Sequence, residues 1–341
     1  ARRETDTMDT FFDSSWYYLR YCDVGNKKIP FEKRKAEYWM PVDFYTGGAE
    51  HACMHLIYAR FFVKALRDLG MIKLDEPFKR LFNQGMVHGE DGSVMSKSAG
   101  NGVDPLDVSS KNGTDALRLF LVSVASPDKD FAWSSTGIEG SEKFLRRVVN
   151  YSYNAKFGKS DDKSKHKINL AIKAITESIE NMRYNISVIK IRELFDFIES
   201  ENEISKKDFE SFVKLLAPFC PHVAEELWEN LEGKGFVSLA SWPDVDEKKI
   251  DEKFEVAEKN LEKSVADILN ILRIVKEKEG KEGEKIYLYV IPNELSNYNA
   301  ELISKRIGKP VSVFAVNDKK KYDPQGKASK AKPGKPGIFV E

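Results

Sequence analysis

The sequence predicts an α/β protein built in three successive parts, and three observations support this fold class. Residues 1–130 alternate helical patterns with short strand-like runs, which indicates a parallel sheet with helices against it. Residues 131–243 carry helical periodicity almost throughout, so a helix bundle is expected there. Residues 244–341 combine a long amphipathic helix with β-rich runs, which predicts a small α/β domain.

The first part is expected to contain three helices and two short strands. Apolar residues recur at helical spacing near 10–21 and over 49–69, and again from Asp115 to Val124. Strand-like runs lie at 43–46 and 85–88. Because the helices and strands alternate along the chain, the strands are expected to be parallel.

Five amphipathic helices with short connections predict the bundle in the second part. Their apolar stripes begin at Phe144, Ile168, Ile186, Phe209 and Val223. Pro218 ends the fourth helix, and Pro221 lies where the first turn of the fifth helix tolerates a proline.

The third part follows a linker-like segment at residues 242–247. Apolar residues from Phe254 to Val275 lie on one face of a long helix. The remaining elements expected are, in order, a strand at 286–291, a helix at 298–307, a strand at 311–316 and a final strand at 337–340.

The composition excludes several classes of protein. Hydrophobic residues make up 41% and charged residues 32% of the 341 residues, as in globular domains. The sequence contains neither an apolar run of roughly 20 residues, which a membrane span needs, nor a secretory signal pattern. Cys22, Cys53 and Cys220 lie far apart, which favours a reducing, cytoplasmic location. The 54 basic and 54 acidic residues argue against nonspecific nucleic-acid binding.

The segment Val94-Met95-Ser96-Lys97-Ser98-Ala99-Gly100-Asn101, here called the lysine loop, carries the most chemical information. Gly89 and Gly92 predict a tight turn just before it. A lysine on a short Ser/Gly/Asn loop is a point charge that can approach a triphosphate closely. Taken alone, such a string is usually a solvated surface loop, so the interpretation depends on the rest of the sequence.

The lysine loop resembles the Lys-Met-Ser-Lys-Ser signature of class I aminoacyl-tRNA synthetases, with Val94 in place of the first lysine. Four other segments are similar to leucyl-tRNA synthetases, in the same order. They are Met-Asp-Thr-Phe-Phe-Asp-Ser-Ser-Trp-Tyr-Tyr-Leu-Arg at 8–20, Gly-Gly-Ala-Glu-His-Ala-Cys-Met-His-Leu at 47–56, Phe-Asn-Gln-Gly-Met-Val at 82–87 and Gly-Val-Asp-Pro at 102–105. Valyl, isoleucyl and methionyl relatives share the lysine loop but not the first two of these patterns. The resemblance covers most of the chain.

This resemblance implies a function for each part. Residues 1–130 would be the C-terminal half of a Rossmann-like catalytic core, 131–243 an anticodon-binding-type bundle, and 244–341 a tRNA-binding domain. In the family, a nucleotide-binding half with a His-Ile-Gly-His-type motif and an editing domain come earlier, and the first residue here is Ala1 rather than methionine. We therefore expect the C-terminal part of an enzyme, or one subunit of a split enzyme, that is inactive without an N-terminal half.

The implied reaction joins leucine and ATP into leucyl-adenylate and then transfers leucine to tRNA(Leu), with Mg²⁺ accompanying ATP. Lys97 would neutralise charge on the ATP phosphates, while Ser96 and Ser98 would donate hydrogen bonds. Val94 in place of the first lysine leaves the strength of activation open.

The resemblance also assigns residues to two binding sites. The ATP site would comprise Gly48, Glu50, His51, Gln84, Met86, Val87, Met95 and Lys97. The leucine pocket would comprise Phe11, Ser14, Tyr17 and His51. Ordinary core packing and strand ends are the alternative interpretations. His51 and His55, four residues apart, could form half of a zinc site, but further ligands at a suitable spacing are lacking, so no metal site is expected.

Basic residues near the C-terminus predict contacts with tRNA phosphates or, alternatively, a solvated tail. The candidates are Lys320, Lys327, Lys330 and Lys332. Two other functions stay open: a non-catalytic tRNA-binding or scaffold protein derived from a synthetase, and a synthetase for another aliphatic amino acid. The second is possible because an apolar pocket separates aliphatic side chains by only about 1–3 kcal/mol per methylene.

Overall fold

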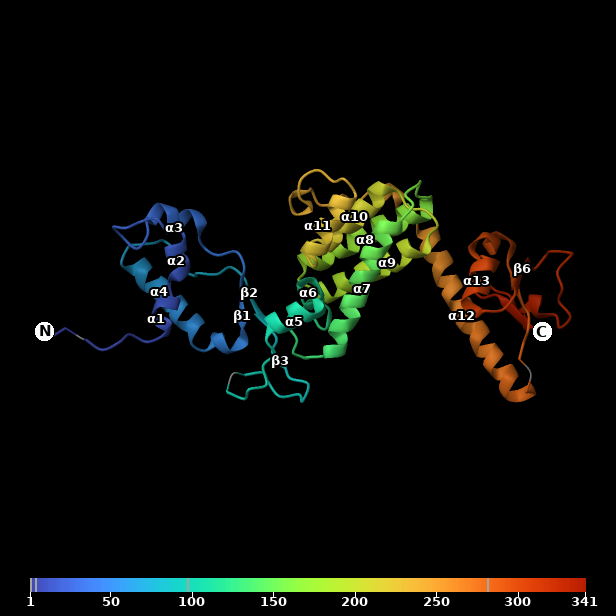
Figure 1. Ribbon diagram of the computed structural model, residues 1–341, viewed down its shortest axis with the longest axis horizontal. Coiled ribbons are helices and arrows are strands. Elements are labelled where there is room, and N and C mark those ends of the chain that lie inside the picture. Colours follow the sequence, from blue (N-terminus) through green and yellow to red (C-terminus); the bar gives the residue numbers. More distant parts are fainter. Residues whose placement is uncertain (1, 4, 97, 281) are drawn as a thin grey trace. The chain divides into compact units, whose positions relative to one another are not determined.

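The computed structural model describes residues 2–3, 5–96, 98–280 and 282–341. The chain divides into two compact units, one made of residues 1–159 with 171–244 and the other of residues 160–170 with 245–341. The first unit contains a partial α/β region and a helix bundle, and the second contains a small sheet with helices (Figure 1). The predicted fold class is therefore confirmed. Among the described residues, no helix is both long enough and apolar enough to cross a membrane.

The helices of the N-terminal region are shorter and more numerous than expected. They are α1 (Phe11–Ser14), α2 (Tyr17–Tyr21), α3 (Lys33–Trp39), the 3-10 turn η1 (Ala49–Ala52) and α4 (His55–Asp68). The helix expected at 10–21 is interrupted at Trp16, whose φ is −143°. The helix expected over 49–69 is split at Met54, whose φ is −121°. The helix α3 is not predicted by the sequence, because Ala36 is its one buried residue and no apolar stripe is visible.

Two pairs of short parallel strands follow the expected parallel arrangement. β1 (Tyr45–Gly48) pairs with β2 (Leu81–Gln84), and β3 (Val87–His88) pairs with β4 (Phe131–Ala132). β1 begins two residues later than the strand expected at 43–46. β2 and β4 were not predicted, because runs of four and two residues show no recognisable two-residue period, and the strands expected at 43–46 and 85–88 overlap the equally short β1 and β3 by only two residues each.

The inner face of α4 forms the core of this region. Ala59 and Val63 are fully buried and pack in one cluster with Tyr18 and Leu19 of α2. The opposite face stays apolar but open to solvent, since Ile57 is 60% and Phe61 is 70% exposed. An exposed apolar face of this kind is typical of a surface that another segment covers.

The helix bundle contains the five helices expected. After α5 (Pro105–Asn112) and α6 (Thr114–Ser123) come α7 (Ser135–Asn154), α8 (Asp162–Glu180), α9 (Tyr184–Ser200), α10 (Lys206–Leu216) and α11 (Pro221–Asn230). Buried aromatic rings join α7, α9 and α10. The Phe195 ring lies 5.6 Å, between centroids, from both Phe144 and Phe212.

A buried carboxylate fixes the start of α11. Asp115 in α6 is 5% exposed and accepts a hydrogen bond of 2.7 Å from the Val223 N–H. The same carboxylate lies 2.8 Å from His222 Nδ1. Asp115 thus satisfies a free N–H of the first turn of α11, which gives His222 a structural neighbour at a helix start.

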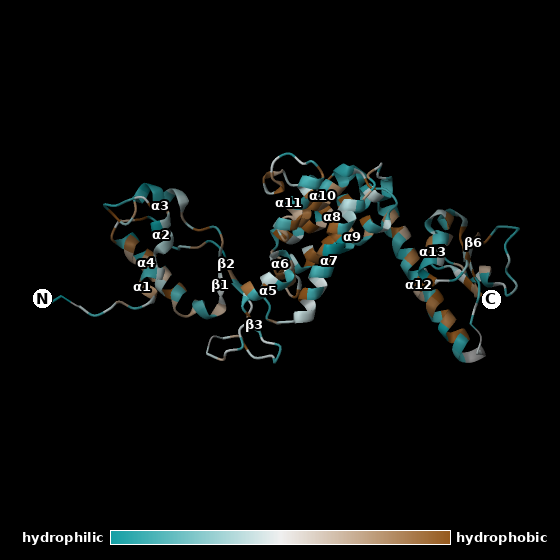
Figure 2. Ribbon diagram, in the orientation of Figure 1, coloured by the Kyte–Doolittle hydropathy of each residue, from teal (hydrophilic) through white to brown (hydrophobic). Residues whose placement is uncertain are grey.

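The second unit builds a three-stranded sheet against helices (Figure 1). Its elements are α12 (Glu252–Glu279), β5 (Ile286–Val290), α13 (Ala300–Ile307), β6 (Val311–Ala315) and β7 (Gly337–Val340). β5 is central, parallel to β6 and antiparallel to β7. Apolar and polar residues alternate along α12 (Figure 2), and its Leu261 and Ile268 pack against Leu288 on one sheet face. Tyr287 and Tyr289 lie in a separate aromatic cluster.

Candidate active site

Three side chains from separate elements form a chain of hydrogen bonds beside β1. The hydroxyl oxygens of Tyr17 in α2 and Tyr45 in β1 lie 2.9 Å apart. The Tyr45 hydroxyl also lies 2.7 Å from Nε2 of His55, the first residue of α4. The Tyr45 hydroxyl has one proton and two polar neighbours, so it donates a hydrogen bond to one of them and accepts a hydrogen bond from the other. We call these three residues the Tyr–Tyr–His network.

Burial favours the uncharged forms of His55 and Tyr45. Burial, with a smaller contribution from nearby His51, lowers the pKa of His55. Burial also raises the pKa of Tyr45, and its hydrogen bond with Tyr17 adds to this effect. Within the described part of the chain, the buried Nδ1 of His55 has no hydrogen-bond partner. A network with one hydrogen-bonding atom still unpaired can orient a polar group of a ligand beside an apolar surface.

Of these three residues, sequence reasoning placed only Tyr17 in the site. The sequence predicts only a strand at Tyr45, and for His55 it suggests a metal ligand or a core histidine. Tyr45 lies 28 positions from Tyr17 and 10 positions from His55 in the sequence, so no local sequence pattern predicts these contacts. The available signal was the short segment between β1 and α4, because it keeps Tyr45 close to His55 at the start of α4.

His51 and Glu50 lie at the exposed edge of the network. The His51 and His55 rings are 6.2 Å apart between centroids, in an edge-to-face arrangement. His51 Nε2 lies 3.8 Å from a Glu50 carboxylate oxygen, and these side chains are 50% and 59% exposed. Both side chains are therefore accessible to a ligand that binds next to Tyr45.

The proposed nucleotide residues Gly48 and Gln84 are brought together by strand pairing. Their Cα atoms are partners in the register of β1 and β2, at the carboxyl ends of both strands. Ligands of open α/β sheets bind at this edge. A Cβ on Gly48 would clash with the Glu50 carboxylate, so glycine allows Glu50 to fold back over the strand end.

The three candidates for the leucine side-chain pocket are not on one helix. Phe11 and Ser14 belong to α1 and Tyr17 to α2. The Phe11 ring stacks on Tyr58 with centroids 6.4 Å apart, and Ser14 Oγ donates to the Phe11 carbonyl at 3.2 Å. Phe11 thus contributes an apolar wall, while the Ser14 hydroxyl is already engaged locally.

The lysine loop is closed by the side chain of Asn101. Its Oδ1 accepts from the Ser96 N–H at 2.9 Å, and its Nδ2 donates to Ser93 Oγ at 2.8 Å. Ser96 Oγ in turn lies 3.2 Å from Ser98 Oγ and accepts from the Ala99 N–H. Lys97 itself lies outside the described residues. Asn101 is a residue that sequence reasoning missed, although it belongs to the loop.

The backbone around Met86 and Val87 is largely engaged within the protein. The Met86 N–H donates to Asp130 Oδ1 at 2.7 Å, and its carbonyl accepts from the Phe131 N–H at 3.1 Å. The Val87 carbonyl accepts from the Met95 N–H at 3.1 Å. Contact with an adenine here would therefore involve the Met86 side chain, which is 40% exposed, more than its backbone.

Two segments of the chain match known protein families. Residues 1–134 match the family of class I tRNA synthetases for isoleucine, leucine, methionine and valine, and residues 161–290 match the anticodon-binding domain of tRNA ligases. Leucine–tRNA ligase of Petrotoga mobilis is 43% identical over 272 residues, which is 72% of this chain. That of Dehalococcoides mccartyi strain 195 is 45% identical over 259 residues, again 72% of the chain. The chain belongs to the leucyl-tRNA synthetase family.

A solved leucyl-tRNA synthetase shows the same fold. The agnB2 enzyme of Agrobacterium radiobacter K84, in a ternary complex described as LeuRS–tRNA–LeuAMS, is 33% identical, with a TM-score of 0.66 over 73% of this chain and 34% of its own. The chain spans about a third of the curated relatives, 33% and 32% of the two ligases named above. As a class I synthetase relative, it belongs to a family that uses ATP.

The four lysines proposed to contact tRNA lie between residues 320 and 332, in the second unit. Lys327 and Lys330 bound the 3-10 turn η5 (Lys327–Lys330), and Lys332 follows it. Asp323 accepts hydrogen bonds from the Lys327 and Ala328 N–H groups, which fixes the turn. Lys320, Lys330 and Lys332 are exposed and Lys327 is half-buried. In the described part of the chain, none of the four forms an ion pair.

Proposed function

We propose that this chain carries the leucine-activating site of a leucine–tRNA ligase. Leucine and ATP would form leucyl-adenylate and pyrophosphate, and the leucyl group would then pass to tRNA(Leu). The observation that carries the proposal is the Tyr–Tyr–His network beside the Gly48 and Gln84 strand ends, in a chain 43% identical to a leucine–tRNA ligase. Apart from Tyr45, these residues lie in three of the segments that resemble the leucyl enzymes.

The network and its neighbours would bind leucine in a defined orientation. Phe11, stacked on Tyr58, offers an apolar wall to the branched side chain, while the Tyr17 hydroxyl offers a polar contact for the amino group. His51 and Glu50 would contact the adenylate from the exposed edge, with Gly48, Gln84, Met86 and Val87 framing the nucleotide.

The lysine loop would stabilise the departing pyrophosphate. A leucine carboxylate oxygen attacks the α-phosphorus, and the bond from the α-phosphorus to the oxygen that bridges it to the β-phosphorus breaks. That oxygen leaves with pyrophosphate, so negative charge moves onto pyrophosphate. Lys97, with Ser96, Ser98 and the Met95 backbone, would meet that charge. Such a contact accelerates the reaction only by the amount that it strengthens in the transition state.

Mg²⁺ would arrive with ATP. Among the described residues, no group of three or more His, Cys, Asp or Glu side chains could hold a metal ion. Mg²⁺ in nucleotide sites is commonly bound through the phosphates and water with few protein ligands. The roles proposed for the side chains of this chain therefore do not depend on a metal ion held by the protein.

We also propose that activity requires an N-terminal half, in the same chain or in a separate subunit. Two features support this. β1 and β2 form a two-stranded parallel sheet, although parallel sheets are normally larger and buried on both faces. The α4 face with Ile57 and Phe61 is apolar and exposed. Further strands beside β1 or β2 and a cover over α4 would complete this catalytic core.

The remaining regions would contact tRNA. We propose that residues 131–243 act as the anticodon-binding-type bundle and residues 244–341 as a tRNA-binding domain, following the catalytic part at 1–130. The exposed Lys320, Lys330 and Lys332, together with Lys327, would meet tRNA phosphates.

Replacing Lys330 and Lys332 by alanine should weaken tRNA binding and make it less sensitive to salt. Each phosphate contact that is lost lowers the slope of log K against log salt concentration by somewhat less than about one unit. A titration of tRNA(Leu) at several salt concentrations measures this slope. Lys263→Ala, at an exposed position of α12, is the control and should leave the slope nearly unchanged. An unaltered slope in the double variant would contradict the assignment of the lysines.

Tyr45→Phe should raise the KM for leucine about tenfold in the pyrophosphate-exchange reaction. The change removes the hydroxyl that orients Tyr17, the proposed contact of the leucine amino group, and a hydrogen bond lost in this way weakens binding by about 1–1.5 kcal/mol. Tyr153→Phe removes the hydroxyl that donates to Glu226 in the bundle and should leave this KM unaltered. Equal behaviour of the two variants would refute a role of the network in leucine binding.

The amino-acid specificity is tested by measuring ATP–pyrophosphate exchange with a panel of leucine, isoleucine, valine and methionine, using this chain together with an N-terminal half. The proposal predicts the highest kcat/KM for leucine. A clear preference for another aliphatic amino acid would favour the second function left open by the sequence.

A further inference from the structure

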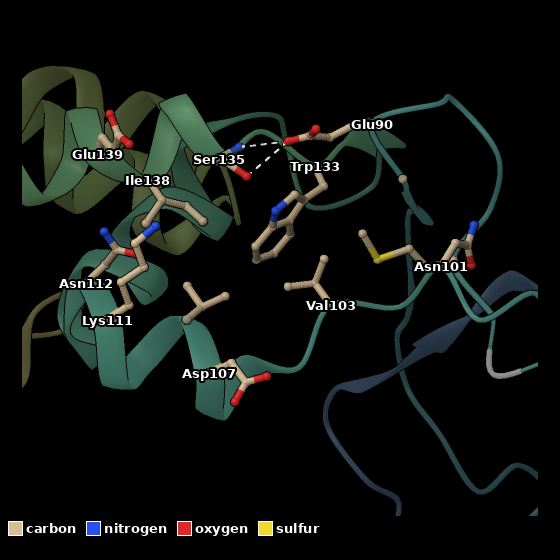
Figure 3. A pocket seen from close by; sticks show the side chains of 13 residues that line it. Glu90, Asn101, Val103, Asp107, Lys111, Asn112, Trp133, Ser135, Ile138 and Glu139 are labelled. Atoms are coloured by element: carbon tan, nitrogen blue, oxygen red, sulfur yellow. Dashed lines mark hydrogen bonds between the residues drawn. The ribbon is translucent and has the colours of Figure 1, made fainter.

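The carboxylate of Glu90 connects the turn that precedes the lysine loop to the start of α7. Its Oε1 accepts hydrogen bonds from the Ser135 N–H at 3.2 Å and from Ser135 Oγ at 3.0 Å (Figure 3). Ser135 is the first residue of α7, so its N–H has no partner within the helix. A negative charge at this end of a 20-residue helix is also favoured by the helix dipole.

The same turn is attached to residues 130–132 by strand pairing. Val87 and His88 pair with Phe131 and Ala132, and His88 Nε2 lies 3.6 Å from the Asp130 carboxylate. The turn is closed internally, since His88 Nδ1 lies 2.9 Å from the Gly92 carbonyl oxygen and Gly92 has a φ of +80°. The segment that precedes α7 therefore positions the base of the lysine loop.

Behind the loop lies a cavity of about 430 Å³. Met95 and Asn101 line it from the loop side, Lys111 and Ile138 line it from α5 and α7, and Trp133 points into it (Figure 3). Because this space is not filled by packed side chains, the loop gains little rigidity from it. The polar contact of Glu90 with Ser135 bridges the loop base and α7 at the margin of this cavity.

We propose that Glu90 is a positioning residue that holds the lysine loop against the first turn of α7. Glu90 touches neither substrate nor the reacting atoms in this assignment. It acts by restricting the positions of the segment that carries Ser96 and Ser98. Its effect on catalysis, though not its effect on the loop, rests on the proposed function.

Hydrogen exchange on the full chain tests the effect on the loop without any need for catalysis. In Glu90→Ala, the amides of residues 89–101 should exchange about three- to tenfold faster than in the unmodified chain, because a charged contact at a helix N-terminus is lost. Glu90→Gln, which keeps an acceptor oxygen but loses the charge, should show an intermediate increase. Glu139→Ala, on the first turns of α7 and also beside the cavity, is the matched control and should leave the loop unchanged.

A kinetic measurement separates positioning from general destabilisation. With an N-terminal half present, Glu90→Ala should raise the KM for ATP several-fold and leave the KM for leucine unchanged, with partial recovery in Glu90→Gln. Unchanged exchange of residues 89–101 in Glu90→Ala would overturn the proposal, as would equal acceleration in Glu139→Ala. Faster loop exchange in a chain whose unmodified form never supports leucine-dependent pyrophosphate exchange would uphold the role of Glu90 while refuting the proposed function.

Discussion

Lys97→Ala is expected to lower the rate of leucine-dependent ATP–pyrophosphate exchange by about 10²- to 10³-fold, the usual cost of removing one preorganised charge-stabilising group. The measurement uses this chain with an N-terminal half at saturating leucine and ATP. The loss should appear in kcat more than in the KM for leucine, because charge on pyrophosphate develops in the transition state.

The surroundings of Lys97 support so large an effect. Asn101 Oδ1 accepts a hydrogen bond from the Ser96 N–H, and the Ser96 and Ser98 hydroxyl oxygens lie 3.2 Å apart, so the described residues on either side of position 97 are tied to the loop. Since Val94 replaces the first lysine of the family signature, Lys97 is the remaining cation of that signature.

The control for Lys97→Ala is Lys111→Ala, which removes a lysine that lines the cavity behind the loop. It should retain most of the exchange activity. Binding of tRNA(Leu) should be almost unchanged in both variants. A Lys97→Ala protein that keeps nearly full exchange activity would favour the non-catalytic, tRNA-binding alternative.

Gly85→Ala should destabilise the first unit by about 3 kcal/mol, in the range of severe overpacking. A Cβ at this position would clash with the carbonyl oxygen of Lys129 and with the Asp130 nitrogen, which are backbone atoms that cannot rotate away. The Gly85 N–H also donates to the Pro127 carbonyl at 2.9 Å, so both segments are fixed at this crossing. Urea unfolding followed by circular dichroism measures the free energy of unfolding.

The matched control is Gly102→Ala in the same region. A Cβ there would meet no atom within 4 Å, and the residue does not have a positive φ. Its substitution should change the free energy of unfolding by less than about 1 kcal/mol. Equal stability of the two variants would show that the close crossing of Gly85 and Lys129 is absent in solution.

The sequence predicted elements with long apolar stripes well. α12 and the bundle helices appear where the helical period is sustained over several turns, and β5 and β6 appear where β-branched and aromatic residues cluster. Elements that depend on neighbours were missed. β2 and β4 exist because β1 and β3 pair with them, and α3 shows no stripe because Ala36 is its one buried residue.

The candidate site divides in the same way. Residues within recognisable segments, such as His51 and Gln84, are assigned to the site from resemblance alone. Tyr45 was missed because its partners Tyr17 and His55 lie 28 and 10 residues away on other elements. Glu90 lies in the turn predicted between Gly89 and Gly92, but the sequence indicates no role for it, since its partner Ser135 is 45 residues away. Long-range polar contacts of this kind leave no period or spacing in a single sequence.

The most direct test of the central claim is leucine-dependent ATP–pyrophosphate exchange, measured for this chain alone, for an N-terminal half alone and for the two together. We predict exchange in the mixture only, with strong dependence on leucine and loss on Lys97→Ala. Exchange by this chain alone would contradict the need for a second half. No exchange in a mixture that demonstrably associates would contradict the claim that this chain carries a leucine-activating site.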